Sequence, residues 1–429
     1  MRTILPGALL LMVAIPPGFA ARPPSPKEQL RFTLIISRHG VRAPLSSAAA
    51  YSAQPWPEWE VPAGRLTPHG AEALHQMGAY MRQDVANHGL FPATGCTEHT
   101  ETYLYSDTDE RNISSSRATF DSFALGCDPL PIHTVDPTNL DPLFRTSGLS
   151  PSLADGTEAR RTALLAESPN VFSRESHAQL ELLSHILAPD PAHPAEKSIF
   201  GPFDQSPVDP ADVIAASRPR SIASEIVEDL LLEYVDGKPI GHVGWGRVDE
   251  ITLRKLIPLR IGAFNVEKRT TPFAKAASSN MLAHILETLD QAESNTATPG
   301  ALGPPGTRLV YISGHDGDLA GIGGLLGLHW IADGNKDETP PDSQIVFELW
   351  RRAGSGRWTI RIRYRAQTLD QLRNASILTT ANPPAELLLT PTGCASPTNC
   401  SFKVFRKVAS RRLDPIYVKA VMMPLQVAP

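Results

Sequence analysis

The chain has 429 residues, of which 45 are acidic and 40 are basic, so its formal net charge is −5 at pH 7. This length is enough for two domains, or for one large domain that carries an insertion. The mild negative charge argues against a general affinity for nucleic acid, and any site that binds an anion must therefore be local.

The start of the chain has the pattern of an export signal. Met1 and Arg2 give a basic beginning, an apolar run covers residues 9–15, and Gly18-Phe19-Ala20 offers small residues for cleavage. The apolar run is too short for a membrane anchor, and no later segment is apolar enough to span a bilayer. We predict that residues 1–21 are a signal peptide and that the mature protein is periplasmic or secreted, with no membrane contact after cleavage.

Export makes the four cysteines candidates for disulfide bonds. Cys394 and Cys400 flank a short, turn-rich segment, which favours a bond between them and leaves Cys96 with Cys127. Three connectivities are possible for four cysteines, and the sequence alone does not exclude the other two.

The first predicted element of the mature chain is a buried strand that ends in a cluster of charge. Residues 32–36 are mostly apolar, as is typical of parallel strands that are covered on both faces. Arg38, His39 and Arg42 follow directly. Because open α/β sheets place ligand sites at such strand ends, and because guanidinium groups bind phosphate well, this cluster predicts a phosphate site.

Two later strands end in the same way. Residues 102–106 lead into an acidic run that closes with Arg111, and residues 308–313 lead into His315 and Asp316. A single strand end of this kind could be accidental. Three of them indicate one shared site at the edge of a sheet.

Helical patterns occur in the segments between the predicted strands. Thr67-Pro68 predicts a helix start and Gly89 its end, and further helices are predicted over residues 176–187, 222–235 and 272–289. Strands over residues 344–350 and 358–363 form a predicted hairpin. Between about residues 136 and 260 no strand ends in a site, so we interpret that region as a mostly helical insertion.

The run Arg38-His39-Gly40-Val41-Arg42-Ala43-Pro44 resembles the RHGxRxP motif of the histidine acid phosphatases. This branch of the histidine phosphatase superfamily includes bacterial phytases and glucose-1-phosphatases. His315-Asp316 resembles the second motif of the family, and Arg111 resembles its distal phosphate-binding arginine. The resemblance extends from about residue 30 to residue 405 and is weakest in the insertion.

The resemblance implies an α/β fold in which a mostly parallel central sheet is flanked by helices, as in phosphoglycerate mutase, with an inserted, mostly α-helical cap. Residues 28–135 and 261–425 would form the discontinuous core, and residues 136–260 would form the cap. The resemblance also favours the disulfide pairs Cys96–Cys127 and Cys394–Cys400.

The implied reaction is hydrolysis of a phosphomonoester through a phosphohistidine intermediate. His39 would be the nucleophile, and Asp316 would give a proton to the leaving group. The residues that would bind the substrate phosphate are Arg38, Arg42, Arg111 and His315. The partner is then a small phosphomonoester, no metal or other cofactor is needed, and an acid pH optimum is expected because Asp316 must be protonated.

The chain departs from the family pattern at two places. Gly317 and Asp318 stand where the family commonly has Thr or Ser and then Asn, and a second carboxylate repels phosphate unless it is protonated or turned away. We expect Asp318 to change the pH optimum or to weaken phosphate binding. The lysine that enteric phytases carry shortly after the first motif is also absent, which favours a less charged substrate or a different lysine, such as Lys275. Phytate and sugar phosphates both remain candidate substrates.

Two alternatives remain open. The first is a metal-dependent phosphatase in which His39, His315, Asp316 and Asp318 bind zinc, iron or manganese, although three nearby arginines would repel the ion. The second is an exported protein that binds phosphate esters but has little activity, because Gly317 and Asp318 disable it.

Overall fold

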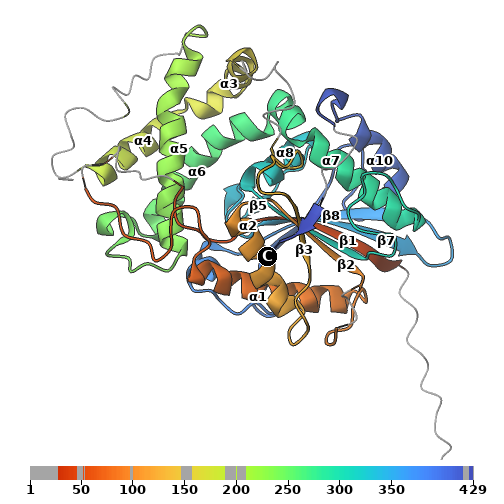
Figure 1. Ribbon diagram of the computed structural model, residues 1–429. Coiled ribbons are helices and arrows are strands. Elements are labelled where there is room, and N and C mark those ends of the chain that lie inside the picture. The colour runs from red at the N-terminus through yellow and green to blue at the C-terminus, as the bar shows by residue number, and fades with distance from the viewer. Residues whose placement is uncertain are drawn as a thin grey trace, which may run out of the picture.

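The computed structural model describes residues 28–45, 52, 54–96, 100–145, 157–188, 200, 209–418 and 425–428 (Figure 1). The predicted signal peptide, residues 1–21, lies outside the described residues. A central sheet has helices on both faces, and a second group of helices stands beside it. None of the described helices is long and apolar enough to cross a membrane.

In the described part of the chain, nine strands form the central sheet, in the order β10-β8-β7-β1-β4-β2-β3-β11, with β9 paired to β8. Strands β1, β4, β2 and β3 are parallel, and the other pairings are antiparallel. The strands are β1 (Glu28–Arg38), β2 (Thr102–Ser106), β3 (Ile132–Val135), β4 (Leu309–Gly314), β7 (Gln344–Arg352), β8 (Trp358–Ala366), β9 (Ala385–Leu389), β10 (Cys400–Ser401) and β11 (Leu425–Val427). The α/β fold class is confirmed, and the parallel pairing is confined to the half of the sheet that carries the motifs.

Strand β1 lies at the centre of the sheet and determines where the site forms. Leu34, Ile35 and Ile36 are at most 1% exposed, so the predicted burial on both faces is confirmed. In the registers of β1 with β4 and of β2 with β4, Ser37 and Ser106 both pair with Ser313. The three strands that carry the motif residues therefore end at the same level.

Helices cover both faces of the sheet. Helices α1 (Pro68–Asn87) and α2 (Glu110–Phe123) pack on one face through Ile35, while α7 (Thr271–Ser294), α8 (Asp316–Leu326) and α10 (Phe402–Ser410) pack on the other through Leu34 and Ile36. Thr67 caps α1 by accepting a hydrogen bond from the Gly70 amide at 2.9 Å, so the predicted helix start is confirmed.

The glycine-rich sequence of α8 allows close helix packing. A Cβ added at Gly321 would lie 2.0 Å from Ser278 Oγ, and one added at Gly324 would lie 2.3 Å from the Arg269 carbonyl oxygen. Only glycine fits at these contacts with α7 and with the end of α6 (Glu250–Arg269). This packing fixes the direction of α8, and hence the position of the site residues at its first turn.

The second group of helices consists of α3 (Thr157–Val171), α4 (Arg174–Leu187), α5 (Val213–Val235) and α6 (Glu250–Arg269), and we call it the helical layer. It has its own core, which includes Leu183, Ile226 and Leu256. The predicted helices over residues 176–187 and 222–235 are confirmed. The domain boundaries remain a prediction, and α6 is continuous across the predicted boundary at residue 260.

The remaining elements are short. They are the hairpin β5 (Ile331–Ala332) and β6 (Asn335–Lys336), helix α9 (Leu369–Arg373), and 3-10 turns at Val243–Gly246 and Pro415–Tyr417. Disulfide bonds join Cys96 to Cys127 and Cys394 to Cys400, which are the pairs that the family resemblance favours.

Candidate active site

The three strand ends predicted from the sequence meet at one place. The His39 amide donates to the Gly314 carbonyl oxygen at 3.0 Å, and the Asp107 amide donates to that of Ser313 at 3.1 Å. The ring centroids of His39 and His315 are 5.7 Å apart. The strand register thus places the side chains that follow β1, β2 and β4 around a common point.

The loop after β1 is held tightly against α1 and α2. The Gly40 amide donates to Ser115 Oγ at 3.0 Å, and a Cβ added at Gly40 would lie 2.6 Å from Leu74 Cδ1. Gly70 in the first turn of α1 approaches the loop just as closely, because its added Cβ would lie 2.3 Å from the Val41 carbonyl oxygen. The small residues let the helices fix the positions of His39 and Arg42.

His39 is held as a neutral imidazole. Its Nδ1 lies 2.8 Å from the Gly40 carbonyl oxygen, which can only accept, so Nδ1 carries the proton and Nε2 keeps its lone pair. Burial, followed by the charges of Arg38, Arg42, His315 and Arg111, lowers the pKa of His39 well below its ordinary value. The imidazole therefore stays unprotonated, and nucleophilic at Nε2, at acid pH.

His315 is oriented by a buried carboxylate. Its Nε2 lies 2.7 Å from Oδ2 of Asp107, whose side chain is fully buried. Burial alone would raise the pKa of Asp107, but the hydrogen bond and charge of His315, together with Arg145, lower it to about 2. Asp107 is thus ionised at the pH where an acid phosphatase would work, and its hydrogen bond fixes the orientation of the His315 ring.

Two arginines neutralise the acidic run after β2. Arg111 Nη2 lies 2.5 Å from Asp109 Oδ2, and Arg145 Nη2 lies 3.0 Å from Asp107 Oδ2 and 2.7 Å from Asp109 Oδ2. The possible ligand atoms of Asp107, Asp109 and His315 lie within 4.8 Å of one another, as a metal site requires. A metal ion there would have to displace both guanidinium groups, so the geometry gives the metal-dependent alternative little support.

Asp316 is the first residue of α8 and lies between two arginines. Its Oδ2 is 3.5 Å from Arg38 Nη2 and 3.3 Å from Arg260 Nη2. Burial raises the pKa of Asp316, but Arg38 and Arg260 outweigh this effect, and the pKa is lower than that of an ordinary aspartate. Strong acidity suits a group that releases its proton readily, and it confines the protonated form to low pH.

Glu228 of α5 brings a carboxylate of the helical layer into the centre of the arginine cluster. It accepts hydrogen bonds from Arg38 Nη2 and from Arg260 Nε, and its Oε1 lies 3.9 Å from Arg42 Nη2. Burial raises the pKa of Glu228, but Arg260, Arg38 and Arg42 together lower it far below the ordinary glutamate value. Glu228 thus remains ionised. In the absence of phosphate it pairs with Arg38 and lies near Arg42, which are two of the arginines that a phosphate would bind.

Asp318 is turned away from the arginines. Its Oδ2 accepts a hydrogen bond from the His315 amide at 2.7 Å, so it caps the first turn of α8. Burial raises its pKa to about 7, and the carboxyl group is therefore mostly neutral at acid pH. Both conditions under which this carboxylate would not repel phosphate are met in this geometry.

All six predicted catalytic and phosphate-binding residues come together, but the sequence did not reveal four of their partners. They are Asp107, Glu228 and Arg260, which contact the six directly, and Arg145, which pairs with Asp107 and Asp109. Glu228 had no usable sign either, because it stands beside Asp229 on a helix that also carries Glu225 and Glu233. Arg145 and Arg260 carry no local pattern, since their roles depend on how distant segments pack.

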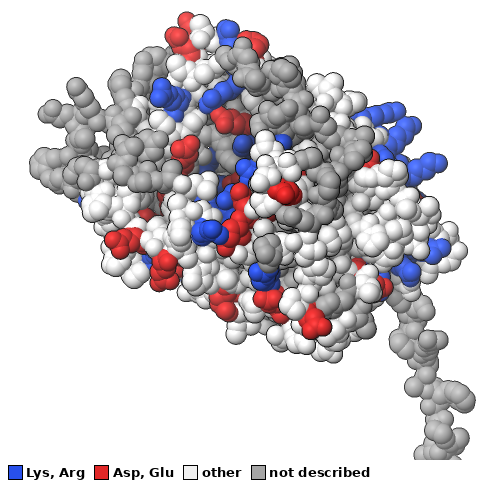
Figure 2. Space-filling view, in the orientation of Figure 1, with Lys and Arg blue, Asp and Glu red and all other residues white. Residues whose placement is uncertain are grey.

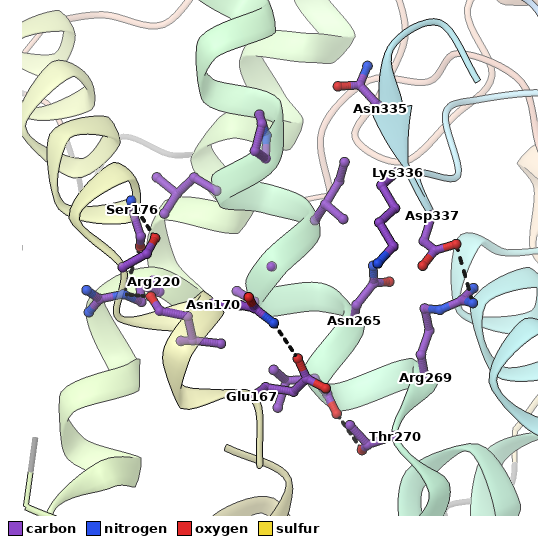
Figure 3. Close-up of a pocket in the computed structure, with 18 of the residues that line it drawn as sticks. Glu167, Asn170, Ser176, Arg220, Asn265, Arg269, Thr270, Asn335, Lys336 and Asp337 are labelled. Carbon is purple, nitrogen blue, oxygen red and sulfur yellow. Dashed lines mark hydrogen bonds and ion pairs between the residues drawn. The ribbon is translucent and has the colours of Figure 1, made fainter. Parts of the chain in front are cut away.

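Charged side chains of both signs gather in a hollow on the face of the molecule shown in Figure 2. A separate cavity of about 730 Å³ lies along a different face of α6 and contains none of the motif residues (Figure 3). One ion pair lies in its lining, between Arg269 and Asp337 at 3.5 Å. The arginine cluster, not this cavity, has the chemistry of a phosphate site.

Comparison with known proteins identifies the family. Residues 29–365 match the histidine phosphatase superfamily (branch 2), and the chain therefore belongs to this family. It is 31% identical to the phytase AppA of Escherichia coli (strain K12), over 92% of this chain and 94% of the relative. It is 26% identical to a glucose-1-phosphatase of Salmonella typhimurium, over 92% and 93% of the two chains.

Solved structures agree with this assignment. A Hafnia alvei phytase in complex with tartrate superposes with a TM-score of 0.77 at 26% identity, covering 93% of this chain and all of that chain. A phytase from Citrobacter braakii gives 0.75 at 25% identity, covering 91% and 99%. The predicted family is thus confirmed over nearly the whole length of the chain.

Proposed function

We propose that this chain is an acid phosphomonoesterase that acts through a phosphohistidine on His39. The observation that carries the proposal is a neutral, buried imidazole whose unprotonated Nε2 lies among arginines. Family membership supports the reaction class, and the named relatives support phytate or a sugar phosphate as the substrate.

In the first step, Nε2 of His39 attacks phosphorus in line with the leaving oxygen. The P–N bond forms while the ester P–O bond breaks, and the leaving alkoxide takes the proton of Asp316. The groups that would stabilise the charge on the transferring phosphoryl oxygens are Arg38, Arg42, Arg111 and His315. In the second step, Asp316 takes a proton from a water molecule that attacks phosphorus, and His39 leaves as a neutral imidazole.

Phosphate binding would help to protonate Asp316. Arg38 and Arg260 lower the pKa of Asp316, and a phosphate that pairs with Arg38 reduces this effect. The pKa of Asp316 should therefore be higher in the substrate complex than in the free enzyme. The donor is still strongest at low pH, which gives the expected acid optimum.

The compartment is part of the proposal. Two disulfide bonds are typical of an oxidising environment, and they agree with export directed by the predicted signal peptide. We propose a periplasmic or secreted enzyme whose partner is a small phosphomonoester rather than nucleic acid.

The test is phosphate release by the purified mature protein from phytate, glucose 1-phosphate and an aryl phosphate between pH 3 and pH 8. We expect turnover at acid pH that His39→Ala lowers by at least about 10⁴-fold, with the fold checked by circular dichroism. Activity that persists with a chelator would support the phosphohistidine route. Loss of activity with the chelator would favour a metal-dependent enzyme, and no release from any substrate would favour a binding protein.

A further inference from the structure

A stripe of side chains on α6 extends away from Asp316. Arg260, Phe264 and Lys268 follow one another at intervals of four residues, so they lie on one face of the helix. Arg260 Nη2 is 3.3 Å from Asp316 Oδ2, and Arg260 Cζ lies 5.3 Å from the centroid of the Phe264 ring. Lys268 Nζ lies 6.0 Å from the same centroid. The stripe thus connects the proposed proton donor to a lysine.

Lys268 lies over the first turn of α8. A Cβ added at Gly317 would be 3.7 Å from Lys268 Cδ and 3.9 Å from Lys268 Cε, and these are its only near contacts among the described residues. Gly317 directly follows Asp316. The lysine stem is therefore placed one residue from the proposed proton donor, beside a position that lacks a side chain.

The surroundings of Lys268 differ from those of the arginines at the site. The arginines around the site each have a carboxylate within 4 Å, as Arg38 has Glu228 and Arg111 has Asp109. Among the described residues Lys268 has no such partner, and the adjacent Glu267 pairs with Arg160 at 2.7 Å instead. An ammonium group without a carboxylate partner, next to a phosphate site, is suited to a second anionic group.

We propose that Lys268 forms a subsite for a second phosphate of the substrate, so that compounds with several phosphate groups are preferred over compounds with one. The inference rests on the proposed function and names its substrate class. One phosphate would be held by the arginines at His39, while another would contact Lys268 Nζ beside the Phe264 ring. The absent side chain at residue 317 leaves the Lys268 stem room at this position.

The experiment compares Lys268→Met with the wild type on phytate, which has many phosphates, and on glucose 1-phosphate, which has one. We expect the KM for phytate to rise about tenfold with little change in kcat, and both constants for glucose 1-phosphate to change less than about twofold. Lys268→Arg keeps the charge and should restore most of the phytate affinity. The matched control is Lys255→Met, since Lys255 is an exposed lysine on the same helix. It should leave KM and kcat unchanged for both substrates.

The outcomes separate this inference from the proposed function. A wild type that hydrolyses both substrates, combined with an unchanged phytate KM in Lys268→Met, overturns the subsite and leaves the reaction class intact. An equal rise in KM for both substrates also overturns it, because Lys268 would then act on the reacting phosphate. A wild type without activity on any phosphomonoester refutes the proposed function itself. Gly317→Thr provides a second test, since its Cβ would contact the lysine stem and the atoms beyond it would compete with the stem for the same space. The KM for phytate should rise, as in Lys268→Met.

Discussion

The strand ends and the helical layer contribute to the same site in different ways. His39, Asp107 and His315 follow strands whose register holds them level, so their positions are set by backbone pairing. Glu228 and Arg260 reach the site from α5 and α6, through side chains that cross between layers to contact Arg38 and Asp316. The comparison suggests that the sheet positions the reacting groups and that the helical layer adjusts their charge.

After His39→Ala, the largest effect should come from Asp316, which begins α8 two residues after the end of β4. Asp316→Asn removes the proposed proton donor while keeping its shape, and we expect kcat on glucose 1-phosphate to fall by about 10² to 10⁴-fold. An aryl phosphate has a better leaving group and should lose much less. Steady-state kinetics on both substrates checks this.

Equal losses on the two substrates would contradict the role of Asp316 as a donor. They would show that the carboxylate acts in binding or in orienting Arg38. If Asp316→Asn unfolds at the same temperature as the wild type, the loss of activity is not a folding defect.

Substitution of a residue in the helical layer should change the pH dependence of kcat more than it changes the maximum value of kcat. The groups that face Asp316 are Arg38, Arg260, Glu228 and His315. Arg260→Gln removes a cation 3.3 Å from Asp316, so the pKa of Asp316 rises. Because the donor must be protonated, the alkaline limb of the kcat profile should move to higher pH.

Arg260→Lys keeps the charge and should move this limb less. Arg254→Gln is the matched control, because Arg254 is on the same helix but pairs with Glu250 and Asp333. Arg260→Gln could instead lower kcat as much as Asp316→Asn does and leave the pH profile unchanged. The idea that the sheet and the helical layer have different roles would then be wrong.

The smallest effect on activity should come from Asp318→Asn. Asparagine still offers an oxygen to the His315 amide, so kcat/KM at acid pH should change less than about threefold. Stability should respond to pH. The pKa of Asp318 is about 7 in the folded chain and about 3.8 in the unfolded chain, so wild-type stability from this group is present below pH 4 and is lost as the pH rises toward 7.

The Asp318→Asn variant does not lose stability in this way, because asparagine has no carboxyl group to ionise. Relative to wild type, its free energy of unfolding should increase between pH 4 and pH 7 by up to about 4 kcal/mol, which urea unfolding at the two pH values measures. A large drop in activity at acid pH would show instead that the Asp318 carboxyl has a direct role in catalysis.

Much of the fold could be read from local patterns. The apolar run of β1, the Thr67 cap and the hairpin of β7 and β8 all depend on neighbouring residues, and all three are confirmed. The six predicted catalytic and phosphate-binding residues also meet, because each lies within five residues of the end of β1, β2 or β4. Local sequence suffices where backbone geometry alone delivers a side chain.

The rest depends on packing that sequence patterns do not encode. Glu228 and Arg38 are separated by 190 residues, and Arg145 and Asp107 by 38. The orientation of Asp318 was also hidden, because only the closing of the first turn of α8 shows that its carboxyl group faces the His315 amide. Each of these contacts requires the three-dimensional arrangement of segments that are irregularly spaced along the chain.

The contact between Glu228 and Arg38 has a consequence for how turnover ends. Since Glu228 stays ionised and pairs with Arg38 when no phosphate is bound, release of inorganic phosphate exchanges one anion for another on the same guanidinium group. The departing product does not leave a buried cation without a partner. Product inhibition should therefore be weaker than a cluster of unpaired arginines would give, and the enzyme would keep working as phosphate accumulates.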